Sequence, residues 1–386
     1  MADISSYTAS VFGDKSVSVA RKLLVGGKDY SHLVTRWPSI TRDEKTVSPG
    51  NVTVLLDAAG GKLNTFVNSA SAIVTSAHLL IGADVNSLGL VYSGIVSGMT
   101  IKRGVASLVM KNKLYKLTVR EIGTEESPVT FTDSTLPSDI FWAICTSYGG
   151  LSAVQSDSNP DIDYPAFATW ANVFSRDSVF MNGEFTGIKC MEALRKLARY
   201  TDSTITADFT KIVPRRFDQT LSAVDSVTDS ELADMRVVIS DNEVVNKFTT
   251  YGAYDTTSRQ YGAAVTLVNT ASRDVYDSRE KTEKDASIWY VSSSACQNLS
   301  ERRIAYYADV RNTHEYVTGL TQIQRHIGDT VFIQDAQLGI SDTPIRITRI
   351  KLDMQTGRMT FGAQVSSISE GFTLDVSTLD GPALLL

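Results

Sequence analysis

The most constraining feature of this 386-residue sequence is a segment whose pattern recurs near both ends of the chain. Residues 99–108 can be laid on residues 352–361 so that Gly104 coincides with Gly357. The apolar residues that then match are Met99 with Leu352, Ile101 with Met354, Ala106 with Met359 and Leu108 with Phe361. Each segment reads as a strand, a tight turn in which glycine supplies a positive φ, and a returning strand with the same face inward. We interpret the repeat as two similar β-units, although two unrelated amphipathic hairpins can also align in this way.

Strand patterns fill the two regions around the repeat, and a mixed region lies between them. Runs rich in β-branched residues, such as 52–56 and 235–239, are typical of strands. Apolar residues at steps of three or four predict a helix over 187–200, and a second helix is predicted over 295–311. We therefore expect a mainly β fold with an α+β insert, divided into an N-terminal β-domain (1–122), the insert (123–217), a second β-domain with one helix (218–370) and a C-terminal tail (371–386).

Charge and composition exclude several classes of protein. The 37 Lys and Arg residues are outnumbered by 43 Asp and Glu, which gives a net charge of −6 and argues against a general nucleic-acid-binding surface. The N-terminus has an early acid and no apolar core, so no signal peptide is expected, and no apolar run is long enough to span a membrane. The three cysteines are odd in number and far apart, which predicts folding in a reducing cytoplasm without a disulfide framework.

Glycine-rich segments do not match phosphate-binding or hydrolase motifs. Neither Gly26-Gly27-Lys28 nor Gly60-Gly61-Lys62 is followed by Ser or Thr, as a phosphate-binding loop requires. In residues 94–98 the serine stands one place away from its position in a hydrolase elbow, and a strand with bulges or turns explains these glycines.

Residues that bind metals or transfer protons are present without a recognisable arrangement. His32, His78, His314 and His326 have no metal-ligand spacing, and we expect them at the surface. Asp157, Asp161 and Asp163 lack the glycine and the final glutamate of a calcium loop and predict a solvated acidic loop. Asp274, Asp277, Glu280 and Glu283 fall in the charged stretch 272–285, which reads as an exposed loop or subunit rim. We therefore predict no catalytic residue, no metal site and no cofactor.

The order of the elements resembles the phage tail hub family, which comprises the baseplate hub of contractile tails and its siphophage counterpart at the tail tip. The resemblance covers roughly residues 17–364. Residues 24–37 with Asp29, 52–57 and 92–96 resemble the family's opening barrel, and residues 188–209 resemble its middle helix and strand. The C-terminal part matches best, in Ser287-Ile288, the helix around Ala305, residues 327–331 and residues 345–361.

The resemblance implies a homotrimer in which two tail-tube-like β-barrel or sandwich domains per chain form a pseudo-six-fold ring. Such a ring joins the six-fold tail tube, or a distal tail protein, to a three-fold spike or fibre. It surrounds a lumen through which DNA, and sometimes a tape-measure protein, passes without specific binding. The expected protein is thus a structural component of the virion tail tip or baseplate, made in the cytoplasm of a bacterial host. A hexameric distal tail or tube-forming ring protein is the first alternative, and a hydrolase that degrades cell walls with scattered carboxylates is the second.

Overall fold

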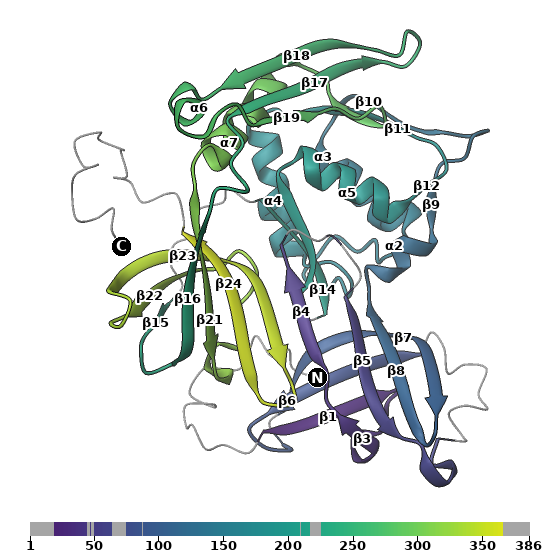
Figure 1. The fold of residues 1–386 in the computed structure, drawn as a ribbon. Helices are drawn as coiled ribbons and strands as arrows, with labels where there is room; N and C mark the ends of the chain where they lie inside the picture. The colour runs from purple at the N-terminus through teal and green to yellow at the C-terminus, as the bar shows by residue number, and fades with distance from the viewer. Residues whose placement is uncertain are drawn as a thin grey trace.

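Two large curled sheets form one half of the molecule, and helices with smaller sheets form the other half (Figure 1). The computed structural model describes residues 19–44, 47, 50–63, 75–86, 88–208, 210–216 and 225–365. The predicted C-terminal tail, residues 371–386, lies outside the described residues. The mainly β architecture with a helical insert, expected from the sequence, is confirmed.

The first sheet has seven strands in the order β2-β1-β6-β7-β8-β5-β3. Its strands are β1 (Ala20–Val25), β2 (Lys28–Asp29), β3 (Val34–Arg36), β5 (Asn51–Asp57), β6 (Ser76–Gly82), β7 (Gly89–Lys102) and β8 (Val105–Asn112), with the short helical turns η3 (Ser31–Leu33) and η4 (Ala59–Gly61) between them. Alternation along β8 places Ala106, Leu108 and Met110 on the core side, each fully buried. One face of this sheet is therefore core.

The second sheet has the order β15-β22-β23-β24-β21-β16, and β4 (Ser39–Asp43) joins it by pairing with β23. Its other strands are β15 (Ser226–Val227), β16 (Leu232–Ser240), β21 (Arg311–Thr318), β22 (Thr330–Asp335), β23 (Ile340–Asp353) and β24 (Arg358–Val365), with the turn η7 (Leu320–Gln322). Buried residues of both sheets belong to one hydrophobic cluster, which includes Leu23 and Val54 of the first sheet and Ile345 and Phe361 of the second.

The two sheets share one topology. When the six main strands of each sheet are numbered in chain order, both sheets read 1-4-5-6-3-2. The fourth and first strands are antiparallel in the first sheet (β6 and β1) but parallel in the second (β22 and β15). The strand order is the same in both sheets, although this one strand direction differs. The expectation of two similar β-units, which rested on the hairpins alone, is therefore confirmed for the whole sheets.

The two predicted hairpins are present as β7–β8 and β23–β24, but one half of the predicted alignment is offset. The pairs that close the turns are Lys102 with Val105 and Asp353 with Arg358. The first turn therefore has two residues and the second has four, so Ile101 corresponds to Leu352 and not to Met354. An offset of two residues returns a strand to the same face, which is why the sequence pattern did not reveal it.

Both hairpins also carry a β-bulge at the same place. Ser97 is the extra residue in β7 and Thr348 is the extra residue in β23. The hydroxyl of Ser97 donates to the carbonyl of Val109 at 3.3 Å, and the hydroxyl of Thr348 donates to that of Gly362 at 3.1 Å. Since regular hairpins do not require a bulge, this coincidence supports the duplication independently of the hydrophobic pattern.

The second half of the molecule is built from two separate stretches of chain. The first contains α2 (Tyr115–Val119), β9 (Glu121–Ile122), β10 (Val129–Thr135), α3 (Pro137–Trp142), the helical turn η6 (Ala143–Tyr148), α4 (Tyr164–Arg176), β11 (Met181–Phe185), β12 (Ile188–Lys189), α5 (Cys190–Tyr200), β13 (Ser203–Asp208) and β14 (Lys211–Arg216). The second, between β16 and β21, contains β17 (Lys247–Asp255), β18 (Gln260–Val268), α6 (Thr270–Tyr276), β19 (Glu280–Glu283), β20 (Ile288–Tyr290) and α7 (Ser293–Tyr307). The predicted helices correspond to α5 and α7.

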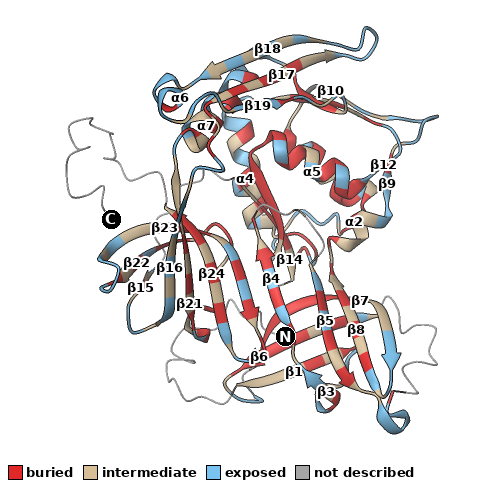
Figure 2. Cartoon of the chain, viewed as in Figure 1, coloured by how far each residue is buried: buried red, intermediate tan, exposed pale blue. Residues whose placement is uncertain are grey.

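A second hydrophobic core joins these two stretches. Strand β20 pairs with β11, and Tyr290, Cys296 and Leu299 lie in the same cluster as Trp170 and Leu194. Buried positions on α5 line its inner side (Figure 2). In the described part of the chain, no helix combines the length and the apolar character needed to cross a membrane.

Candidate functional site

The described feature that most directly joins the parts of the molecule is β4, a strand that leaves the first sheet and completes the second. Strand β3 ends at Arg36, and Trp37-Pro38 follows. Proline favours an extended conformation in the residue before it and has no N–H for a ladder. The chain then pairs antiparallel with the last part of β23, with Ile40 opposite Leu352. The carbonyl of Pro38 accepts from the Met354 N–H at 3.0 Å.

The turn of the second hairpin is fastened to the first sheet by Arg21. Its guanidinium donates to the carbonyls of Met354 and of Gln355, the latter at 3.1 Å. The Gln355 side chain accepts from the backbone N–H of Trp37 at 3.0 Å. The pKa of Arg21 is lowered by burial, which Asp353 opposes. These contacts hold β4 and the hairpin in register at the junction of the two sheets.

The far end of β4 meets both the second sheet and the helical half. The Glu44 carboxylate pairs with the guanidinium of Arg346 at 2.6 Å, and both side chains are buried. The backbone N–H of Glu44 donates to the carbonyl of the bulge residue Thr348, and its carbonyl accepts from the Thr204 hydroxyl, both at 2.9 Å. Glu44 therefore connects the end of β4 with the second sheet and with β13 of the helical half.

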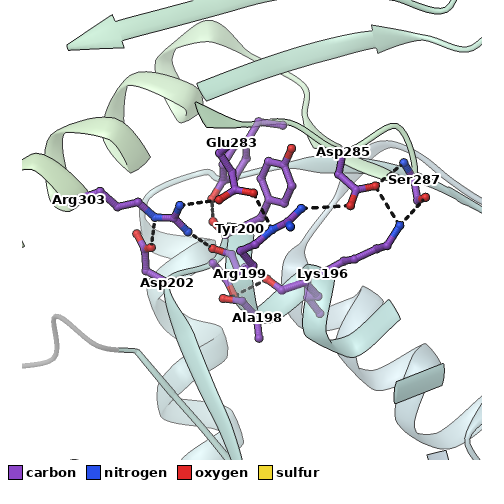
Figure 3. A network of polar contacts seen from close by, with 12 residues as sticks. Lys196, Ala198, Arg199, Tyr200, Asp202, Glu283, Asp285, Ser287 and Arg303 are labelled. Carbon is purple, nitrogen blue, oxygen red and sulfur yellow. Dashed lines mark hydrogen bonds and ion pairs between the residues drawn. The ribbon is translucent and has the colours of Figure 1, made fainter. Parts of the chain in front are cut away.

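A network of buried charges connects the two stretches of the helical half (Figure 3). Arg303 on α7 reaches Asp202 at 2.5 Å and Glu283 at 2.7 Å. Arg199 on α5 pairs with Glu283 at 2.6 Å and with Asp285 at 3.1 Å. Burial alone would lower the pKa of Arg303, but Asp202 and Glu283 outweigh it and raise that pKa. The charged form is thus favoured where these segments meet.

A cavity of 460 Å³ lies beside this network. Its wall carries both signs of charge, with Arg195, Arg199 and Lys281 on one hand and Glu44 and Asp202 on the other. Over the described ranges, no group of three or more His, Cys, Asp or Glu residues is placed to hold a metal ion. Arg195 donates to the Val47 carbonyl at 2.8 Å, and Arg199 and Asp202 belong to the network, so these three residues bridge segments at the cavity wall.

The histidines are less exposed than the sequence predicts. His314 in β21 is 3% exposed, and burial lowers its pKa, so its expected surface position is wrong. His78 in β6 is half-buried, whereas His32 is exposed. His326 lies 3.7 Å from the carboxylate of Asp329. Both β6 and β21 contain several buried positions, and His314 is one of them while His78 lies between two of them, which explains why these two histidines are not exposed.

The predicted acidic loop is also partly buried. Asp161 pairs with Lys113 at 2.8 Å, and burial, which raises its pKa, is outweighed by that ammonium, so its pKa is lowered. Asp163 is the N-cap of α4 and accepts from the Ala166 N–H at 3.0 Å. Asp157 is exposed, as predicted. These carboxylates serve the local fold, and they do not converge on one point.

The charged stretch 272–285 is wrongly predicted to be an exposed rim throughout. It forms the end of α6 and all of β19, and Glu283 is 3% exposed within the network described above. Glu280 is exposed and pairs with Lys247 at 2.7 Å, and Asp274 and Asp277 are exposed as well. The burial of Glu283, its partner Arg303 and the strand β4 were not predicted from the sequence. The alternation of Ser-Ile-Thr-Arg-Asp after Trp37-Pro38 was the available signal for β4.

Known proteins resemble this chain in structure but not in sequence. No family model matches it, and no curated protein matches it. The 43 kDa tail protein of prophage MuSo2 from Shewanella oneidensis is 15% identical, with 91% of this chain and 99% of that chain covered and a TM-score of 0.57. A tail protein from Neisseria meningitidis MC58 is 14% identical, with 91% and 98% covered and a TM-score of 0.59. The prophage tail protein gp18 from Listeria monocytogenes EGD-e is 12% identical, with 94% and 98% covered and a TM-score of 0.54.

Proposed function

We propose that this chain, which has the fold of those phage tail proteins, is a structural tail hub that adapts a six-fold tail tube to a three-fold spike. The observation that carries the proposal is the duplicated sheet within a fold that matches tail proteins over 98–99% of their chains. A chain with two similar units can occupy two neighbouring positions of a six-fold ring. Three chains then complete the ring while keeping true three-fold symmetry.

The hub has a mechanical role. Its two tube-like β-units fall within residues 1–122 and 218–370 except that β4 joins the second sheet, and residues 123–217 form the insert that carries α3 to α5, to which β17 to α7 add from the second unit. The ring contacts a tail tube or distal tail protein on one side and a spike or fibre on the other. Sheet edges that pair across subunits close such a ring, because each edge strand offers unpaired N–H and C=O groups.

The lumen of the ring lets DNA, and a tape-measure protein where there is one, pass without binding. The net charge of −6 supports this part of the proposal, because retention of DNA requires cations that neutralise its phosphates. The hub belongs to the virion, at the tail tip or baseplate, and has no catalytic role. A peptidoglycan zymogram of the purified protein is expected to stay blank, and clearing that a single Asp or Glu substitution abolishes would refute the absence of catalysis.

The symmetry of the assembly tests the adaptor role. Native mass spectrometry of the purified full chain is expected to give a trimer of the 42.1 kDa subunit. Cryo-electron microscopy of that particle is expected to show six similar sheets around one channel. A ring of six identical chains would instead identify a distal tail or tube-forming protein, and the adaptor role would be wrong.

A further inference from the structure

The second sheet shows how an exposed edge is covered in this fold. The last part of β23, residues 349–353, pairs with β24 on one side and with β4 on the other. On the core face of this contact Ile40 lies opposite Leu352, and the two side chains are 5% and 2% exposed. An apolar edge is thus buried by a strand that the first unit supplies to the second.

The equivalent edge in the first sheet has no such cover among the described residues. Residues 98–102 of β7 correspond to residues 349–353, and in the described part of the chain they pair with β8 alone. Ile101, the counterpart of Leu352, is 45% exposed, and Val105 across the turn is 44% exposed. An uncovered edge with apolar side chains is a site where another strand can add.

Strand β16 is the counterpart of β3 and β4 in the second unit. Both β3 and β16 carry a bulge at the same point, Thr35 in one and Ala233 in the other. After this bulge β16 continues along β21 to Ser240, and its outer edge has no partner among the described residues. Counting from the bulges places Val238 where Ile40 stands in β4. Val238 is 45% exposed and its neighbour Ile239 is 66% exposed.

We infer that β16 of one copy pairs antiparallel with residues 98–102 of β7 in a second copy of this chain. This contact between chains is equivalent to the antiparallel pairing of β4 with β23 within one chain. The register follows from the β4–β23 pairs and places Val238 opposite Ile101, Val237 opposite Lys102 and Asp241 opposite Gly98. In this register the exposed side chains of Val238 and Ile101 lie on the same face of the joined sheet and cover each other.

The inference rests on the proposed ring and specifies its contact between chains. The two surfaces that meet are different, so the contact is head-to-tail and continues from chain to chain until the ring closes. Within a chain the first unit reaches the second through β4, and between chains the second unit reaches the first of the next chain through β16. Each contact around the ring, within a chain or between chains, is thus made at the same edge of a β-unit, the last part of β7 or β23.

Cysteine crosslinking of the full chain tests the register. Antiparallel neighbours place their Cβ atoms about 4.5–5.5 Å apart, close to the separation that a disulfide spans. The variant carries Ile101→Cys and Val238→Cys and is oxidised as the assembled particle, then run on a non-reducing denaturing gel. The control carries Ile101→Cys and Asp241→Cys, which the register separates by about 10 Å along the strand. The native Cys145, Cys190 and Cys296 are fully buried and do not interfere.

We expect at least about ten-fold more crosslinked chain in the first variant than in the control, with a ladder that ends at the covalent trimer. A particle that is trimeric by mass but gives no more crosslink than the control would overturn this contact and leave the hub proposal standing. A ladder that ends at six chains would keep the contact and overturn the trimer. A protein that stays monomeric by mass and is not crosslinked would overturn both.

Discussion

Removal of the Arg303 charge is expected to destabilise the helical half of the molecule strongly. In Arg303→Met the carboxylate of Asp202, which is 9% exposed, loses its closest cation, and that of Glu283, which is 3% exposed, loses one of its two arginines. Removing one partner of a buried ion pair costs about 3–5 kcal/mol, because the remaining charge stays desolvated. Glu283 keeps Arg199 at 2.6 Å and Asp202 keeps Arg302 at 3.6 Å, so the loss falls at the lower end, about 3 kcal/mol.

Urea unfolding at one fixed protein concentration measures this loss. With a denaturant slope of about 3 kcal/mol per molar, the midpoint of the unfolding transition falls by about 1 M. The matched control is Arg236→Met, which removes an equally short ion pair with Glu315 at 2.6 Å from an arginine side chain that is 67% exposed. Exposed pairs contribute little, so the control midpoint is expected to stay with that of the wild type.

A third variant separates the charge from the packing. When Asp202→Asn and Glu283→Gln are added to Arg303→Met, no buried carboxylate remains without its arginine, and most of the lost stability is expected to return. Equal midpoints for the wild type and Arg303→Met would refute the reasoning. A triple variant as unstable as the single one would show that the guanidinium matters by its contacts, such as its position 4.9 Å from the Phe248 ring, and not by its charge.

Three further perturbations test the sheets. Ile40→Ala removes the 5%-exposed side chain that β4 presents to the second sheet and should cost about 2–5 kcal/mol in urea unfolding; a loss below about 1 kcal/mol would mean that β4 contributes little. Gly94→Ala places a Cβ 2.2 Å from the Lys111 carbonyl oxygen and should cost about 1–3 kcal/mol of stability. In the control Gly98→Ala, in the same strand, the Cβ meets nothing within 4 Å, so equal losses in the two variants would contradict the steric argument. Burial lowers the pKa of His314 in the folded protein, so its contribution to stability is present above the unfolded pKa of about 6.5 and is lost as the pH falls through the lowered value. The variant His314→Gln should therefore show a smaller drop in the unfolding midpoint between pH 7.5 and 5.5. An unchanged pH dependence would refute this expectation.

Local periodicity explains what the sequence could predict. Apolar spacing predicted α5 and α7, because a helix that buries one side must repeat that spacing. The repeated hairpin predicted the duplicated sheet, and its error of two residues arose because a strand repeats its face every second residue. The helix α4 was missed, although Asp163 as N-cap and Pro165 in the first turn are helix-start signals.

Contacts between residues that are distant in the sequence explain which features the sequence could not predict. Glu283 stands among exposed charges in the sequence, and only the packing of α7 against β17, the neighbour of β19 in the sheet, brings Arg303 to it. A run of alternating charges predicts a solvated surface because most such runs have no buried partner. The partner of β4 is equally remote, since Ile40 and Leu352 are separated by most of the chain. Neither pairing leaves a local pattern.

The two copies of the fold differ in the strand that follows the shared bulge, and residue chemistry explains this difference. Counting from the shared bulge, Pro38 in the first unit stands where Arg236 stands in the second. Arg236 has the backbone N–H that a ladder requires and pairs in register with Glu315, so β16 stays on its own sheet. Pro38 has no N–H to donate to a ladder, so the chain departs after β3 and the same stretch becomes β4. One unit therefore gives a strand to its partner within the chain, while in the other β16 continues along its own sheet, with an outer edge that has no partner among the described residues.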